Sequence, residues 1–131
     1  MRRDGMGLHT VLIVDDSSTS RMIIRRCFEM AGYTAEKFLF AASGREGLET
    51  AMKERDIGLI ITDINMPEMD GPTFIRKLKE ERGDRAIPVC VVSSIGDGTE
   101  LRGLQAHDIL GVVKKPVTPE KFRHLLGERY E

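Results

Sequence analysis

Short apolar runs recur along the chain, separated by stretches whose apolar residues follow helical spacing. The runs cover residues 10–16 (TVLIVDD), 38–42 (FLFAA), 57–63 (IGLIITD), 87–94 (IPVCVVSS) and 109–113 (ILGVV). Polar and apolar residues do not alternate inside these runs, as they do in a strand that has one face in water. The pattern therefore predicts five strands that are buried on both faces.

The intervening stretches carry the signals of amphipathic helices. The first has one apolar stripe that is predicted to face the core, made of Ile23, Ile24, Cys27, Phe28 and Ala31. Ser17 or Ser18 is the expected N-cap of this helix. In the second stretch, Ser43 and Glu46 form a capping box, and we expect the helix to run to about Arg55.

Proline and threonine mark the starts of later helices. Pro72 lies in the first turn of a predicted third helix, whose inward face is Phe74, Ile75 and Leu78. Thr118 and Pro119 are the expected N-cap and first residue of the last helix, whose inward face is Phe122, Leu125 and Leu126. A fourth helix is expected near 97–106. It should be short or mobile, because each of its two glycines costs up to about 1 kcal/mol relative to alanine.

Strand and helix thus alternate along the whole chain. This order predicts an α/β fold in which right-handed crossovers build a doubly wound, five-stranded parallel sheet with five helices on its two faces. A length of 131 residues is that of one domain. We expect residues 10–131 to form this domain and residues 1–9 to be an N-terminal extension.

Charge and composition exclude several function classes. Twenty Lys and Arg against 21 Asp and Glu give a net charge of −1, so no overall field attracts nucleic acid or an anionic membrane. The N-terminus lacks an apolar signal region and no run of about 18 apolar residues occurs, which predicts a cytoplasmic protein without membrane insertion. Arg21, Arg25 and Arg26 are interpreted as the solvent-exposed side of the first helix or as docking residues, with no direct contact to nucleic acid.

Polar residues collect where the apolar runs end. They are Asp15, Asp16, Asp63, Ser93 and Lys115. Taken singly, each has a structural explanation, because Asp and Ser often cap helices or form turns. In an open parallel sheet, however, the ends of the strands meet in one crevice, where three carboxylates would repel one another unless a cation joins them. Mg²⁺ suits such oxygens, and lysine and serine can donate to phosphoryl oxygens, so the sequence predicts a phosphate-and-magnesium site.

Four motifs carry a family resemblance: VLIVDDSSTSR at 11–21, TDINMPEMDGP at 62–72, VVSS at 91–94 and KP at 115–116. In order and spacing they resemble the response-regulator receiver domain, and most of all the single-domain, chemotaxis-type regulators. The resemblance spans nearly the whole chain, from about Thr10 to the final helix. It implies the flavodoxin-like strand order 2-1-3-4-5, of which a chemotaxis regulator is a known example.

The resemblance also implies roles in phosphoryl transfer. Asp63 would be the phosphoryl acceptor, whose carboxylate attacks a phosphohistidine on a sensor histidine kinase or phosphotransfer protein. Ser93 takes the position of the family's switch hydroxyl and Lys115 that of its lysine, both of which reach the phosphoryl oxygens. The Lys115–Pro116 bond is usually cis in this family. A receiver of this kind signals by phosphorylation-dependent binding to a downstream protein target and is not a conventional turnover enzyme.

The same resemblance implies the magnesium ligands. Asp16 and Asp63 would bind Mg²⁺ through their side chains and Asn65 through its backbone carbonyl, while Asp15 would hold a metal-bound water. Lys114, the neighbour of Lys115, is expected to face away, because successive strand residues face opposite sides.

One position departs from the family pattern. Val112 stands three residues before Lys115, where the family usually has an aromatic residue whose inward or outward swing reports the movement of the switch hydroxyl. A valine cannot make that swing.

Two other classes of protein are alternatives to a receiver domain. A Mg²⁺-dependent phosphohydrolase with an Asp nucleophile would need a general acid two residues after the nucleophile, where this chain has Asn65, and a cap for which the length leaves no room. A flavin-binding module of the flavodoxin type would need aromatic residues around the flavin, and the chain has no Trp and two Tyr.

Overall fold

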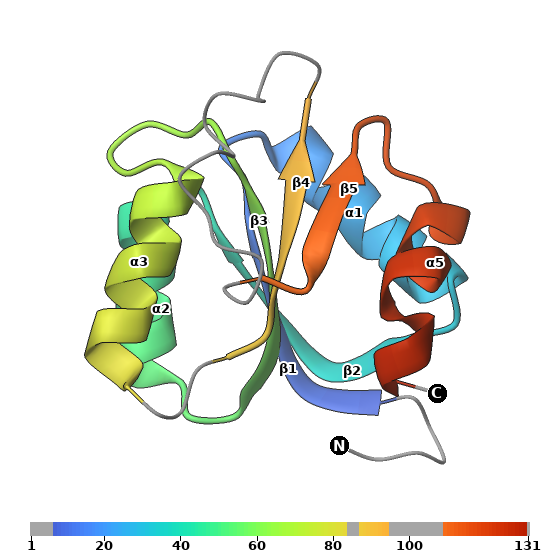
Figure 1. Ribbon diagram of the computed structural model, residues 1–131, viewed down its shortest axis with the longest axis horizontal. Coiled ribbons are helices and arrows are strands. Elements are labelled where there is room, and N and C mark those ends of the chain that lie inside the picture. Colours follow the sequence, from blue (N-terminus) through green and yellow to red (C-terminus); the bar gives the residue numbers. More distant parts are fainter. Residues whose placement is uncertain (1–6, 84–86, 95–108, 131) are drawn as a thin grey trace.

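The computed structural model describes residues 7–83, 87–94 and 109–130. Its strands are β1 (Gly7–Val14), β2 (Thr34–Ala41), β3 (Ile57–Asp63), β4 (Val89–Ser93) and β5 (Gly111–Lys114). The described helices are α1 (Ser18–Met30), α2 (Gly44–Lys53), α3 (Gly71–Arg82) and α5 (Pro119–Tyr130). The strands form one parallel sheet in the order β2-β1-β3-β4-β5, which confirms the predicted fold class and strand order (Figure 1). The fourth helix expected near 97–106 lies outside the described residues.

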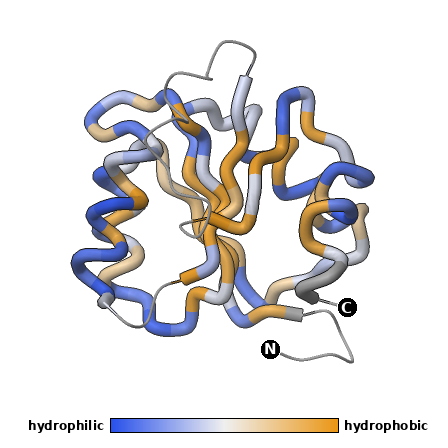
Figure 2. The backbone as a smooth tube through the Cα atoms, viewed as in Figure 1, coloured by the Kyte–Doolittle hydropathy of each residue, from blue (hydrophilic) through white to orange (hydrophobic). Residues whose placement is uncertain are grey.

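The sheet is the middle layer of three. Helices α1 and α5 cover one face, and α2 and α3 cover the other (Figure 1). Successive residues of one strand therefore enter two different cores: Val11 and Ile13 pack with α1 and α5, whereas Leu12 and Val14 pack with α2 and α3. This explains the continuous apolar runs, since both faces of each central strand are removed from water. Figure 2 shows the result as hydrophobic strands inside and hydrophilic outer sides on the helices.

Side-chain N-caps begin all of the described helices. The caps and the backbone N–H groups that donate to them are Ser17 with Ser20 (3.1 Å), Ser43 with Glu46 (3.1 Å), Asp70 with Thr73 (3.0 Å) and Thr118 with Lys121 (3.2 Å). A cap matters because the first N–H groups of a helix have no partner inside the helix. Ser17, not Ser18, is thus the cap of α1. The Ser43 cap and the Thr118 cap are confirmed.

Several local predictions were wrong. Strand β2 begins at Thr34, four residues before the predicted run, and most of its residues are exposed or half-buried, so this edge strand is not buried on both faces as predicted. Strand β1 begins at Gly7, three residues before the predicted start, because it pairs with Thr34 at the start of β2 and buries Leu8.

In α1, Ile24 is fully buried, but Ile23 is 48% exposed. One residue turns a helix by about 100°, and this turn places Ile23 outside the buried stripe formed by Ile24, Cys27 and Phe28.

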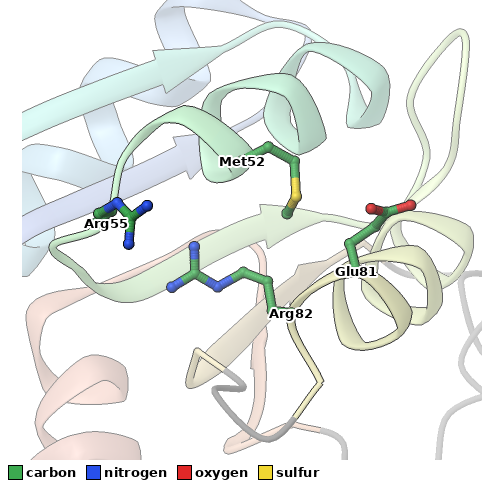
Figure 3. Close-up of a pocket in the computed structure, with 4 residues that line it drawn as sticks. All are labelled: Met52, Arg55, Glu81 and Arg82. Atoms are coloured by element: carbon green, nitrogen blue, oxygen red, sulfur yellow. The ribbon is translucent and has the colours of Figure 1, made fainter.

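A small pocket of about 240 Å³ lies where α2 and α3 end, lined by Met52, Arg55, Glu81 and Arg82 (Figure 3). Arg82 extends from α3, and its Nη1 donates to the carbonyl oxygens of Ala51 (2.9 Å) and Glu54 (3.4 Å). These contacts satisfy carbonyl groups at the end of α2 that have no partner inside that helix. The pocket is therefore part of a structural link between the two helices, and it contains none of the predicted site residues.

The two neighbouring isoleucines of α1 provide a matched test of the packing. Ile24→Ala should lower the free energy of unfolding by about 2–5 kcal/mol, because it empties a fully buried position. Ile23→Ala should change it by less than about 0.5 kcal/mol. Urea unfolding followed by circular dichroism measures both, and equal losses for the two variants would contradict the orientation of α1.

Candidate functional site

The ends of four strands bring the predicted site residues to one edge of the sheet. The last register pairs between neighbouring strands are Val14 with Thr62, Asp63 with Val92, and Ser93 with Lys114. Asp15 and Asp16 follow β1, Asp63 ends β3, Ser93 ends β4 and Lys115 follows β5. Since the strands are parallel and end at the same level, residues far apart in the chain lie at one edge.

Three carboxylates form the centre of the site. One carboxylate oxygen from each of Asp15, Asp16 and Asp63 lies within 4.8 Å of the others. Asp15 and Asp63 are buried, with exposed fractions of 1% and 6%, whereas Asp16 is exposed. The site therefore has two carboxylates shielded from water and a third open to it.

Lys115 supplies the opposing charge. Its Nζ lies 3.5 Å from Asp15 Oδ2 and 3.5 Å from Asp63 Oδ2, so one ammonium is shared between the two buried carboxylates. Its backbone N–H donates to the Ser93 carbonyl at 2.7 Å, and the Lys115–Pro116 bond is cis, as the resemblance implied. Lys114 is exposed, which agrees with the alternation of strand residues.

The first turn of α1 holds Asp15 in place. The backbone N–H of Ser17 donates to Asp15 Oδ1 at 2.9 Å, and the Ser20 hydroxyl donates to Oδ2 at 2.6 Å. Arg21 Nη1 donates to the Asp15 carbonyl oxygen at 2.6 Å. Sequence reasoning missed Ser20 and placed Arg21 on the solvent side of the helix. The signal for both is helical spacing: they stand three and four residues after the capping Ser17, one turn along α1, on the side of the helix where the cap lies.

Burial raises the pKa of the Asp63 carboxyl above its ordinary value of 3.8, and the neighbouring Asp15 charge raises it further. Two contacts act in the opposite direction: the Ile64 N–H, which donates to Asp63 Oδ1 at 2.7 Å, and the Lys115 ammonium. The pKa is still raised, so these two contacts do not fully offset the desolvation and repulsion of the carboxylate.

The surroundings of Asp63 keep it close to the start of α3. A Cβ built on Gly71 would lie 2.6 Å from the Asp63 carbonyl oxygen, so a side chain has no room there. Ser93 is buried, with 1% exposed, and its neighbour Val92 is the register partner of Asp63. Asn65 lies two residues beyond Asp63 in the loop before α3 and is exposed.

Val112 occupies β5 opposite Val91 and is partly buried against the core formed by α2 and α3. The chain thus has a packed aliphatic residue where the family pattern has a swinging aromatic one.

The donor set fits a hard divalent cation. All three side chains offer carboxylate oxygens, which are the ligands that Mg²⁺ prefers. Burial and the neighbouring Asp15 charge raise the pKa of Asp63 despite the Lys115 ammonium. A cation between these oxygens would offset the remaining repulsion.

Comparison with known proteins agrees with this geometry. The family model of the response regulator receiver domain matches residues 11–127. A chemotaxis protein CheY homolog of Campylobacter jejuni is 33% identical over 121 residues, which cover 89% of this chain and 92% of the relative. The structure of the chemotaxis response regulator CheY4 of Vibrio cholerae superimposes with a TM-score of 0.73 at 30% identity, covering 92% of this chain and 98% of that one.

A third relative is a much larger protein. The sensor kinase CckA of Brucella abortus is 35% identical over 130 residues, which are 98% of this chain and 13% of the kinase.

Because the family model matches most of the chain, the chain belongs to the response regulator receiver domains. Within that family it is a CheY-like receiver of two-component signalling. No helix in the described part of the chain is long and apolar enough to cross a membrane.

Removing the shared ammonium tests the charge balance of the site. In metal-free buffer, Lys115→Met should lower the free energy of unfolding by about 1–2 kcal/mol, because two buried carboxylates lose a charged donor. Lys114→Met is the matched control, since this lysine is exposed, and it should change the free energy by less than about 0.5 kcal/mol. Urea unfolding at neutral pH measures both, and equal effects would argue against the shared contact.

The raised pKa of Asp63 gives a pH-dependent prediction. The folded protein holds this proton to higher pH than the unfolded chain does, so wild-type stability falls as the pH rises from about 3.8 through the folded-state pKa. In metal-free buffer at neutral pH, Asp63→Asn should therefore raise the free energy of unfolding measured by urea titration. The gain should disappear below that pH range. Asp56→Asn, at an exposed position beside β3, should show no such gain.

Proposed function

We propose that this protein accepts a phosphoryl group on Asp63 from a sensor histidine kinase or phosphotransfer protein, with Mg²⁺ as cofactor. The phosphorylated form then binds a downstream protein target. The observation that carries the proposal is the placement of Asp63, a buried carboxylate at the end of β3 with Asp15 and the Lys115 ammonium beside it. The protein works in the cytoplasm, without membrane insertion or direct contact to nucleic acid.

The two oxygens of Asp63 are not equivalent. Oδ1 accepts the Ile64 N–H at 2.7 Å, whereas Oδ2 lies 3.5 Å from Lys115 Nζ. Oδ2 is therefore the oxygen that attacks phosphorus. A bond forms between this oxygen and phosphorus while the bond from phosphorus to the imidazole nitrogen of the donor breaks. The leaving nitrogen keeps the electron pair and takes a proton from solvent.

Fixed charges make this transfer favourable. The Lys115 ammonium beside Oδ2 lies where the incoming phosphoryl charge arrives, so it offsets the repulsion between acceptor and donor. The Ser93 hydroxyl, at the end of β4, serves as a further donor to the phosphoryl oxygens. After transfer, the added negative charge draws Ser93 and Lys115 toward the phosphoaspartate. This rearrangement carries the signal to the protein surface.

Receiver domains generally bind Mg²⁺ in an acidic pocket, and the residues of this chain suit that ion. Asp16 and Asp63 would hold it through their carboxylates and Asn65 through its backbone carbonyl, while Asp15 would hold a metal-bound water. When bound, the ion supplies positive charge that offsets the acceptor and phosphoryl oxygens.

The function is tested by following the mass of the intact protein. Incubation with Mg²⁺ and a small phosphodonor should add one phosphoryl group to the wild type, because Asp63 is the acceptor. Asp63→Asn should abolish the gain, since an amide cannot form the acyl phosphate. Asp56→Asn, which alters an exposed aspartate outside the site, should gain the group as the wild type does.

Other outcomes would contradict the proposal. A phosphoryl gain that persists in Asp63→Asn would exclude Asp63 as the acceptor. Steady release of phosphate from phosphate esters, at many turnovers per second, would favour a phosphohydrolase over a signalling protein.

A further inference from the structure

Asp15 is the most enclosed of the three carboxylates of the site, and groups from α1 and from the end of β5 contact its oxygens. With 1% of its surface exposed, it has little contact with water. Its Oδ1 accepts the Ser17 N–H at 2.9 Å, and its Oδ2 accepts the Ser20 hydroxyl at 2.6 Å and faces Lys115 Nζ at 3.5 Å. The Ser20 contact is the shortest of these and has the length of a strong hydrogen bond to an ionised group.

The donors differ in how firmly they are held. Ser20 sits in the first turn of α1, where its own N–H donates to the capping Ser17 Oγ at 3.1 Å. Arg21, the next residue, donates to the Asp15 carbonyl at 2.6 Å and so fixes the backbone of Asp15 relative to α1. Lys115, in contrast, reaches the site on a long side chain that is 30% exposed, and it is shared with Asp63.

Loss of the Ser20 hydroxyl would change the balance between these donors. A buried carboxylate needs its hydrogen bonds, because it cannot replace them with water. Without Ser20, the donor that can move closer to Asp15 Oδ2 is Lys115, and that movement takes the ammonium away from Asp63. The carboxylate would also lose the contact that fixes its orientation toward the other two aspartates.

We propose that Ser20 is a positioning residue that holds the Asp15 carboxylate in orientation for Mg²⁺ binding and leaves Lys115 shared between Asp15 and Asp63. This inference rests on the proposed function, because it concerns the Mg²⁺ that the phosphoryl-transfer site would bind. Residues that orient the groups around a metal without being ligands commonly contribute about 10- to 100-fold to metal affinity, and Asp15 is such a group through the metal-bound water that it would hold. Ser20 therefore raises the affinity of the site for Mg²⁺ although it is not itself a ligand.

Isothermal titration calorimetry with MgCl₂, without any phosphodonor, tests this directly. Ser20→Ala should bind Mg²⁺ about tenfold more weakly than the wild type. Ser20→Thr keeps a hydroxyl at the same position and should bind within about threefold of the wild type. Ser18→Ala removes an exposed hydroxyl from the same helical turn and should leave the affinity unchanged. Circular dichroism confirms that each variant is folded at the temperature used.

A double-mutant cycle with Asp15→Asn separates positioning from a general effect on the helix. If Ser20 acts through Asp15, adding Ser20→Ala to Asp15→Asn should cause no further loss of affinity. The same tenfold loss in that background would overturn the inference, as would equal affinities for Ser20→Ala and wild type, or failure of Ser20→Thr to restore binding.

The two proposals fail separately. If Mg²⁺ affinity depends on Ser20 but Asp63 is not phosphorylated, the proposed function is overturned and this inference is supported. If Asp63 is phosphorylated but Mg²⁺ affinity does not depend on Ser20, this inference is overturned and the proposed function is supported. A wild type that binds no Mg²⁺ would overturn this inference.

Discussion

The burial of two neighbouring carboxylates is the constraint on which the polar site of this molecule depends. Asp15 and Asp63 end up side by side because β1 and β3 are neighbours in a parallel sheet, and both are shielded from water. Lys115 arrives from the far end of the chain, and its ammonium faces both. The contacts of Lys115 with Asp15 and Asp63 therefore form only when β1, β3 and β5 have taken their places in the sheet. Lys115 does not cancel the cost of burying the carboxylate, since desolvation and the neighbouring Asp15 charge keep the pKa of Asp63 raised.

The two hydrophobic cores explain how this cluster of carboxylates is held together. Each central strand packs alternate residues against α1 and α5 on one face and against α2 and α3 on the other, so the strands cannot slide without disrupting both. The carboxyl ends of the strands are thereby fixed at one level. A polar site placed at that edge depends on hydrophobic packing more than on its own contacts, which are costly to bring together.

Most of the fold followed from the hydrophobic pattern, and the reasons lie in particular residues. The third strand was predicted with its observed bounds because residues 57–63 are apolar without a break and end in an acid. Caps at Ser43 and Thr118 were predicted because capping is a local interaction. Ile23 was misplaced because neighbouring apolar residues leave the rotation of a helix open by one position. The early start of β1 depends on pairing with Thr34, which no local pattern shows.

The site was predicted less evenly. Asp15, Asp63, Ser93 and Lys115 were expected at one edge, because residues that follow parallel strands converge there whatever their separation in the chain. The roles of Ser20 and Arg21 were not foreseen. Their contacts depend on how α1 is rotated against the end of β1, a tertiary property that hydrophobic spacing defines only to within a neighbouring residue.

The close approach between Gly71 and Asp63 has a consequence for how this chain tolerates change. Gly71 has no reactive group, and its backbone is not among the left-handed positions of the described residues. Its contribution is the empty volume where a Cβ would meet the carbonyl oxygen of Asp63 and the backbone of Ile64. Even alanine would push α3 and the end of β3 apart. Substitutions of Gly71 are thus restricted by the space around it, just as substitutions of Asp63 are restricted by its carboxylate. A mutational scan would therefore find both positions sensitive, although the sensitivity of Gly71 comes from shape and that of Asp63 from chemistry.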